Sequence, residues 1–171
     1  MKKLVMVING KGGVGKDALC QALEQTYKVV NVSAITPIKE IAAQHGWQGE
    51  KTPQARRFLA ELKRVFVDYN DLPTQYLVEQ YEAFAESDAH ILCVHIREPE
   101  EIAKFVRATG GKAKTLLIRG GDRMKKAVYG NASDDCVEDY DYDYYFLNDK
   151  GLDDAERDFC AFLRSVIEKN V

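Results

Sequence analysis

The sequence predicts an α/β fold in which helices cover both faces of a five-stranded parallel sheet. Short apolar runs alternate along the chain with segments whose apolar residues recur at helical spacing. A glycine-rich turn joins the first apolar run to the first helical segment, as in the opening of a βαβ unit. The 171 residues are 46% hydrophobic and 30% charged, which is typical of one globular domain.

Five short runs are expected to form strands, because they are apolar and bounded by turn residues. The first, KLVMVIN, is apolar almost throughout, which favours a strand buried on both faces of a parallel sheet. The expected strands are residues 3–9, 28–32, 89–96, 113–118 and 142–148. Near the last strand, the carboxylate-rich segment DDCVEDYDYDYY alternates Asp and Tyr. This alternation favours a strand with one polar face over a metal site.

Six segments show helical periodicity, and some of them carry their own start or stop signals. Pro37 and Gly46 bound the second of these segments. Pro99 lies in the first turn of the fifth segment together with three glutamates, and Gly110 marks its end. The expected helices are residues 16–27, 36–46, 52–69, 72–84, 98–111 and 152–169.

The order of these elements predicts a sheet wound in both directions. A helical insert, at about residues 34–88, falls between the second and third strands, and a basic lid, at about 119–140, falls between the fourth and fifth. The chain shows no internal repeat and no interdomain linker, so residues 1–171 are expected to form a single domain.

The turn after the first strand matches a phosphate-binding loop. The pattern Gly-x-x-x-x-Gly-Lys-[Ser/Thr] is met at Gly10, Gly15 and Lys16, but Asp17 stands where a magnesium-binding hydroxyl is usual. Glycines let successive backbone N–H groups converge on an anion, and the following helix adds its positive end. The residues expected to bind phosphate are Gly10, Lys11, Gly12, Gly13, Val14, Gly15, Lys16 and Asp17.

Composition excludes several classes of partner. The net charge of −3 and the pI near 5.7 give no global basic field, which argues against binding to duplex nucleic acid. The four cysteines show no Cys-x-x-Cys or zinc-type spacing and are expected to be reduced and mostly buried. The apolar stretch near the N-terminus is too short for a signal-peptide core or a membrane span, so a cytoplasmic protein that does not bind membranes is expected.

The segment KGGVGK resembles the deviant loop of partition, septum-site and nitrogenase-reductase ATPases, which reads Lys-Gly-Gly-Val-Gly-Lys-Thr-Thr. Those proteins typically end their second strand on an aspartate-rich turn, where this chain has VVNVSAITP. A partition-type ATPase is therefore an alternative supported by the loop alone.

More of the chain resembles the P-loop deoxynucleoside monophosphate kinases of phage type and the related animal phosphomevalonate kinases. Gly15, Lys16 and Asp17 match their Gly-Lys-Asp loop, and similar segments follow in the same order: SAITPIKEIAAQHGW, EKTPQARRFLAEL, VHIREPEEIAKFVRATGGKAKTLLIR and DYDYDYYFLNDKGLDDAERDF. The resemblance implies a three-layer P-loop NTPase fold. It also implies a kinase that uses ATP and Mg²⁺ to phosphorylate a nucleoside or deoxynucleoside monophosphate. It does not indicate an oligomeric state.

The resemblance also implies roles for individual residues. In the resembling kinases the arginine at the position of Arg97 grips the acceptor phosphate, for which a planar fork is well suited. Arg56 and Arg57 are adjacent on a helix and diverge by about 100°, so only one faces the cleft easily. The acceptor-binding residues would be Lys39, Arg56, Arg57 and Arg97, the lid residues Arg119, Arg123, Lys125 and Lys126, the adenine-side residue Asn148, and the metal ligand Asp17.

Two departures from this family concern the metal. Ala18 replaces a threonine, and His95 replaces the aspartate that would follow the third strand. A neutral imidazole is a poor Mg²⁺ ligand, so His95 is interpreted either as a packed strand-end residue or as a substrate contact. The metal ligand could be Asp17, or one of the glutamates Glu98, Glu100 and Glu101, which could equally cap a helix. A catalytically impaired nucleotide-binding or regulatory protein is therefore a second functional class to test.

Overall fold

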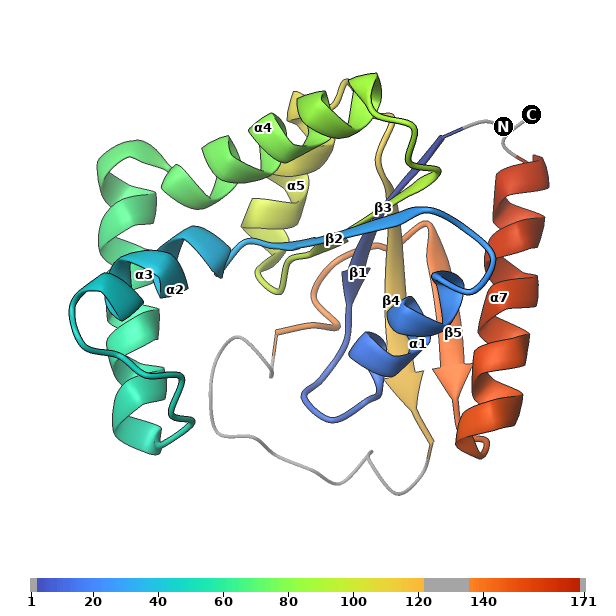
Figure 1. Cartoon of the computed structure of the whole chain (residues 1–171), viewed down its shortest axis with the longest axis horizontal. Coiled ribbons are helices and arrows are strands. Elements are labelled where there is room, and N and C mark those ends of the chain that lie inside the picture. Colours follow the sequence, from blue (N-terminus) through green and yellow to red (C-terminus); the bar gives the residue numbers. More distant parts are fainter. Residues whose placement is uncertain (1–2, 122–135, 170–171) are drawn as a thin grey trace.

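The computed structural model, which describes residues 3–121 and 136–169, contains a five-stranded sheet with helices on both faces (Figure 1). The strands are β1 (Leu4–Asn9), β2 (Val29–Ser33), β3 (Ile91–His95), β4 (Lys114–Gly120) and β5 (Tyr144–Asn148). Their order is β2-β3-β1-β4-β5, and every neighbouring pair is parallel. This confirms the predicted α/β sheet wound in both directions.

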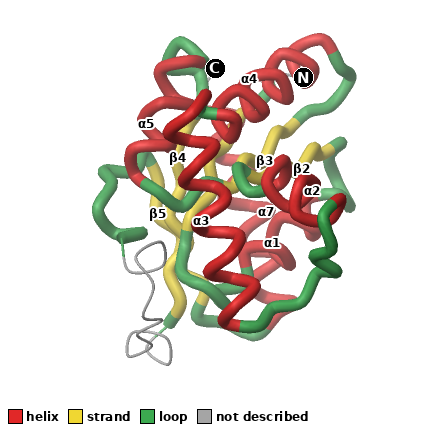
Figure 2. The backbone as a smooth tube through the Cα atoms, turned by 90° about the vertical axis from the view of Figure 1, so that its left-hand side faces the viewer, coloured by secondary structure: helices red, strands yellow, loops and turns green. Residues whose placement is uncertain are grey.

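The helices described are α1 (Lys16–Leu23), α2 (Thr36–Gln44), α3 (Pro53–Asn70), α4 (Leu72–Glu86), α5 (Pro99–Ala108) and α7 (Leu152–Lys169). α1 and α7 pack on one face of the sheet, and α4 and α5 pack on the other, which gives the three layers expected. The α2, α3 and α4 helices lie between β2 and β3 in the chain, and α3 faces the viewer in Figure 2.

The sheet separates two apolar clusters, and β1 contributes side chains to both. Val5 and Val7 point into the apolar cluster beneath α4 and α5. Leu4, Met6 and Ile8 point into the cluster beneath α1 and α7. Because β1 is the central strand and both of its faces are covered, all of its residues are buried, which explains its nearly continuous apolar sequence.

Several predicted boundaries differ from the structure by two to four residues, and two of these differences have a cause in local hydrogen bonds. The first helix ends at Leu23 rather than at residue 27, because the N–H groups of residues 24–26 bond to carbonyls three residues back and tighten the chain into a turn. The last strand begins at Tyr144, two residues later than expected. Asp143 instead accepts hydrogen bonds from the backbone N and the Oγ1 of Thr115, at 2.8 and 3.0 Å. The Asp–Tyr alternation therefore does not form the polar face of a strand.

Three ion pairs hold the helices between β2 and β3 against α5. Lys63 on α3 lies with its Nζ 2.7 Å from Glu98 Oε2 and 2.9 Å from Glu101 Oε2, and its side chain is 12% exposed. Asp71, in the turn between α3 and α4, pairs with Lys104 at 3.0 Å. Because the Lys63 side chain is mostly buried, water screens its charge only weakly. Its ion pairs therefore restrain α3 more than a surface pair would.

Truncation of Phe105, a core residue of α5, should destabilise the fold strongly. Phe105 is fully buried and meets the Tyr81 ring edge-on at 6.5 Å. Phe105→Ala should lower the free energy of unfolding by about 3–5 kcal/mol, measured by urea denaturation, because it removes apolar burial and leaves a cavity. Tyr69→Ala is the control, since Tyr69 is 83% exposed. Equal losses in the two variants would contradict this description of the core.

Candidate functional site

The turn from β1 to α1 has the backbone of an anion-binding loop. Gly10, Gly13 and Gly15 have φ values of +152°, +77° and +87°. A Cβ atom on Gly10 would lie 2.5 Å from the carbonyl oxygen of Ile118 on β4, so no larger residue fits there. The loop therefore passes close over the sheet and leads directly into the positive end of α1.

Lys16 folds back across this loop. Its Nζ donates to the carbonyl oxygens of Gly10, at 2.5 Å, and Lys11, at 3.0 Å. The ammonium group therefore lies among the same glycine peptides that would surround a phosphate. A bound phosphate would replace neutral carbonyl partners with charged oxygens, which form stronger hydrogen bonds with an ammonium.

Asn148, at the carboxyl end of β5, supports the loop from the side. Its Nδ2 donates to the carbonyl oxygen of Val14 at 2.8 Å. A Cβ atom on Gly15 would lie 2.8 Å from this same nitrogen. The residue expected on the adenine side is thus in contact with the phosphate loop.

Asn9 connects the loop to two other segments. It was not among the site residues expected from the sequence. Its side chain is fully buried and accepts from Gly10 N at 2.8 Å. The same amide donates to Arg97 O at 2.9 Å and to the Tyr142 hydroxyl at 2.8 Å, and that hydroxyl donates to Val137 O at 2.8 Å. The available signal was a polar residue at the end of an apolar run, directly before the first glycine.

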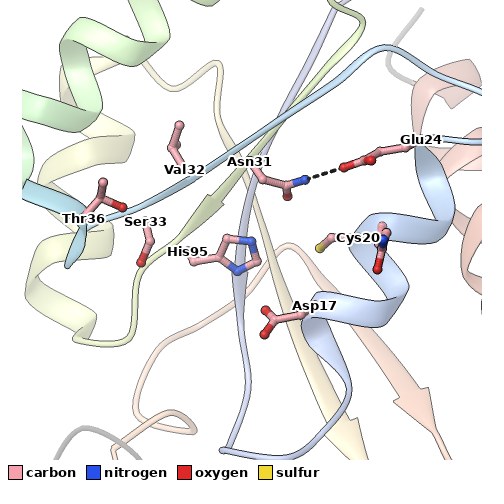
Figure 3. A pocket seen from close by; sticks show the side chains of 9 residues that line it. Asp17, Cys20, Glu24, Asn31, Val32, Ser33, Thr36 and His95 are labelled. Carbon is pink, nitrogen blue, oxygen red and sulfur yellow. Dashed lines mark hydrogen bonds between the residues drawn. The ribbon is translucent and has the colours of Figure 1, made fainter. Parts of the chain in front are cut away.

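A cavity of about 360 Å³ opens beside α1, where the carboxyl ends of β2 and β3 meet it (Figure 3). Its lining residues are Asp17, Cys20, Gln21, Glu24, Asn31, Val32, Ser33, Thr36 and His95. The nine described lining residues include two carboxylates and several neutral polar groups but no lysine or arginine. Ligands of parallel α/β sheets bind at the carboxyl ends of the strands, so this cavity lies where an acceptor is expected.

The side chains of Asp17, Cys20 and His95 converge in this cavity (Figure 3). A hydrogen bond with Cys93 is the main cause that lowers the pKa of Cys20 to about 6. His95 adds to this effect, and burial opposes it. Hydrogen bonding with Cys20 and complete burial raise the pKa of Cys93 instead. His95 is thus a cavity-lining residue that interacts with a thiol, rather than one packed away at the strand end.

The structure places the other predicted residues in different surroundings. Asp17 is exposed in the first turn of α1, at the positive end of the helix. Arg97 is exposed just beyond β3, and its backbone carbonyl is held beside the loop by Asn9. Lys39, Arg56 and Arg57 are exposed on α2 and α3, outside the lining of the cavity.

The predicted lid is described only at its two ends. Arg119 lies within β4, where its guanidinium bonds Glu138 at 2.6 Å and covers the Tyr145 ring at 4.6 Å. The hydrogen bonds to Glu138 raise the pKa of Arg119. Arg123, Lys125 and Lys126 lie outside the described residues.

Of the candidate metal ligands, Asp17 is the one that lines the cavity. Glu98 and Glu101 are engaged by Lys63. Residues 3–121 and 136–169 contain no group of three or more His, Cys, Asp or Glu side chains arranged to hold a metal ion. Mg²⁺ needs no such group when it is bound through one carboxylate, substrate phosphates and water, so Asp17 is compatible with it.

The fold agrees with that of solved structures of low sequence identity. A candidate kinase from Chloroflexus aurantiacus has a TM-score of 0.57 at 12% identity, with 99% of this chain and 98% of that chain covered. The tunicamycin resistance protein of Deinococcus radiodurans has a TM-score of 0.55 at 11% identity, with coverage of 95% and 96%. Shikimate kinase from Aquifex aeolicus has a TM-score of 0.53 at 8% identity, with coverage of 96% and 98%.

The chain has the P-loop NTPase fold. The strand order β2-β3-β1-β4-β5, the glycine loop after β1 and these structural similarities agree on this point. No family model and no curated protein matches the sequence. None of the helices within the described ranges is both long and apolar enough to cross a membrane.

Removal of the Tyr142 hydroxyl should loosen the support of the loop. Tyr142→Phe leaves Val137 O without this donor and Asn9 Nδ2 without this acceptor in a buried site, so the free energy of unfolding should fall by about 1–3 kcal/mol. Urea denaturation measures the loss. The same substitution at exposed Tyr69 should change the stability very little, and equal effects would contradict the role of the hydroxyl.

The difference in stability between the parent and Tyr142→Phe should also depend on pH. Burial raises the pKa of Tyr142 from 10.0 to about 12 in the folded protein. Between about pH 10 and 12 the unfolded chain loses this proton first, so the contribution of Tyr142 to stability is complete below pH 10 and disappears as the pH rises. The stability difference between the parent and Tyr142→Phe should therefore narrow across this range. A constant difference would contradict the raised pKa.

Proposed function

We propose that the chain is an ATP-dependent phosphotransferase that acts on a nucleoside or deoxynucleoside monophosphate. The main support is that a phosphate loop with Lys16 folded across it and a polar cavity share one helix, α1. Donor and acceptor groups would then meet at the N-terminal end of that helix. Phosphoryl transfer depends mainly on such positioning and on positive charge at the transferred group.

On the donor side, the backbone N–H groups of residues 12–16 and the positive end of α1 would bind the β- and γ-phosphates. Lys16 would exchange its contacts with the Gly10 and Lys11 carbonyls for phosphate oxygens. Asp17 would hold Mg²⁺ directly or through water. When bound, the metal would neutralise charge that develops on the phosphates. Asn148 would keep the loop in place through Val14.

On the acceptor side, Arg97 would bind the acceptor phosphate, with Lys39, Arg56 and Arg57 as further cations on α2 and α3. The cavity itself would receive the base or sugar, because amides, hydroxyls and carboxylates can bond to their polar edges. His95 would contact this part of the acceptor.

A second candidate is a kinase for a hydroxyl-bearing acceptor that has no phosphate of its own. It is favoured by the absence of lysine and arginine among the nine described residues of the cavity lining. Shikimate kinase and a sugar kinase are among the structures similar to this chain, so the fold is compatible with such acceptors.

An ADP-release assay across acceptors tests the proposal. Nucleoside and deoxynucleoside monophosphates should stimulate ADP formation in the presence of ATP and Mg²⁺, whereas a response only to sugars or cyclic polyols would favour the second candidate. ATP hydrolysis independent of any acceptor would favour a partition-type ATPase. ATP binding without turnover would favour an impaired nucleotide-binding protein.

Lys16→Ala should weaken ATP binding by at least tenfold, or roughly 1.4 kcal/mol, because the loop loses its charged side-chain donor. Calorimetry with ATP measures the effect. Lys112→Ala is the control, because Lys112 is exposed in the turn before β4. Unchanged ATP affinity in Lys16→Ala would remove the donor-side assignment.

Arg97→Lys keeps the charge but loses the planar fork, so the acceptor KM should rise or kcat fall while ATP affinity is retained. Steady-state kinetics with the best acceptor and calorimetry with ATP measure the two sides separately. If the variant loses ATP affinity but keeps its acceptor kinetics, Arg97 binds ATP rather than the acceptor.

Asp17→Asn should weaken the Mg²⁺ dependence of turnover, because the amide is a poorer ligand for a hard cation than the carboxylate. Asp17→Ser, which restores the common loop pattern, should retain more activity than Asp17→Ala. Initial rates against Mg²⁺ concentration at saturating ATP and acceptor provide the comparison. If the curves of all four proteins coincide, Asp17 does not act through the metal.

A further inference from the structure

An apolar stripe runs along α3, the helix that faces the viewer in Figure 2. Six large apolar side chains are exposed among the described residues, and half of them belong to this helix. Phe58 is 45% exposed, Val65 54% and Tyr69 83%, and half-buried Leu62 lies between the first two along the chain. Successive members of this stripe are four, three and four residues apart, so they line one side of the helix. Alternation of three and four is the spacing with which one helix packs along another.

The residues that follow each member of the stripe lie on a flank that is already covered. Leu59 is buried, and Lys63 forms ion pairs at the start of α5. Phe66 packs against the apolar cluster between α2 and α3. This flank of α3 therefore faces the rest of the protein, and a second helix can approach only from the stripe and the opposite flank.

The residues that precede each member of the stripe form an exposed row of alternating charge. In chain order the row is Arg57, Glu61, Arg64 and Asp68. Arg64 pairs with Asp68 within the helix at 3.8 Å, and both side chains remain largely exposed. The row has no net charge, so it does not select a strongly acidic or basic partner. Because its signs alternate, the row is complementary to its own reversed copy.

We propose that α3 forms the interface of a homodimer, in which α3 of one copy packs antiparallel on α3 of a second copy about a two-fold axis. Leu62 of each copy would then lie against Val65 of the other, and Phe58 would lie against Tyr69. In a parallel pair the charged row would instead meet the flank of the second copy that is already covered. The antiparallel arrangement is therefore the one that the surroundings of α3 allow.

Two-fold symmetry also places the charged row beside its own copy. Two Glu61 and two Arg64 would gather near the axis, and Arg57 would lie toward Asp68 of the second copy. Opposite charges that face each other favour the intended partner and fix the register. Of the two adjacent arginines on α3, Arg57 belongs to this row, so Arg56 is the one that remains for the acceptor. The dimer itself does not depend on the proposed function.

The dimer should be reversible, because one helix from each copy contributes a small interface. A dissociation constant on the order of 10 μM is expected for such a contact. Protein diluted well below this concentration is monomeric, and in the monomer Tyr69 is 83% exposed.

Sedimentation equilibrium of the full-length protein tests the apolar stripe. Measured from about tenfold below to about tenfold above the expected dissociation constant, the parent should pass from monomer to dimer. Val65→Asp should weaken dimerisation at least tenfold, because the carboxylate would be buried against Leu62 of the second copy. Leu152→Asp is the control, since Leu152 on α7 is 60% exposed and lies outside the stripe.

Charge exchange tests the pairing across the axis. Glu61→Arg and Arg64→Glu should each weaken dimerisation at least tenfold, because each gathers four like charges near the axis. The double variant restores opposite signs and should dimerise like the parent. An equimolar mixture of the two single variants should form mixed dimers, because the arginines of one meet the glutamates of the other. Glu168→Arg, at an exposed position on α7, is the control and should dimerise normally.

The proposal is overturned if the parent stays monomeric over this concentration range, which would leave the stripe to a different kind of partner. It is also overturned if Val65→Asp and both single charge variants dimerise like the parent, because the interface then lies elsewhere. Monomeric single variants that neither form mixed dimers nor recover in the double variant would overturn the antiparallel pairing. Circular dichroism checks that each variant is folded. Because the readout is mass, a failure of the proposed kinase activity would not affect these outcomes.

Discussion

The passage of the chain from β1 into α1 is the constraint on which the site depends. β1 lies at the centre of the sheet with both faces covered, so the loop that follows it must turn within the space left by β4. At Gly10 even one methyl group would collide with a backbone carbonyl. The buried Asn9 amide then accepts from the first loop N–H and donates to Arg97, just beyond β3, and to Tyr142, before β5. The positions of the loop amides follow from these contacts.

The helices between β2 and β3 are held by ion pairs, whereas the cavity lining is brought together by strand pairing. Lys63 joins α3 to two carboxylates at the start of α5, and Asp71 joins the next turn to Lys104. β2 pairs with β3 so that Ser33 lies beside His95, and Asn31 on β2 donates to Glu24, directly after α1, at 3.3 Å. Strand pairing and the bond from Asn31 therefore bring parts of the cavity lining together from segments that are separate in sequence.

The glycine-rich loop and the neighbouring cavity differ in charge. Positive groups surround the phosphate loop, through Lys16 and the end of α1, and the described lining of the cavity is neutral or acidic. A phosphate bound at the loop and a polar but uncharged group in the cavity would each meet matched chemistry. Asp17 lies where the two regions meet, in the first turn of α1 and in the lining of the cavity.

The sequence by itself determined the order of the elements, the parallel sheet and the glycine-rich loop after β1. These features depend on local causes: apolar runs of strand length, helical periodicity, and glycines at backbone conformations that other residues avoid. Among the boundaries that failed, the end of α1 and the start of β5 depend on local turns and side-chain contacts that periodicity does not report.

Only the tertiary structure decided which polar side chains act together. Asn9 and Tyr142 are 133 residues apart and Lys63 and Glu98 are 35 apart, and neither pair follows from a local pattern. Cys20 on α1 and Cys93 on β3 are far apart in sequence but belong to the same apolar cluster on one face of the sheet. Such pairs form because folding buries polar groups that need partners, and the partners available depend on how distant elements pack.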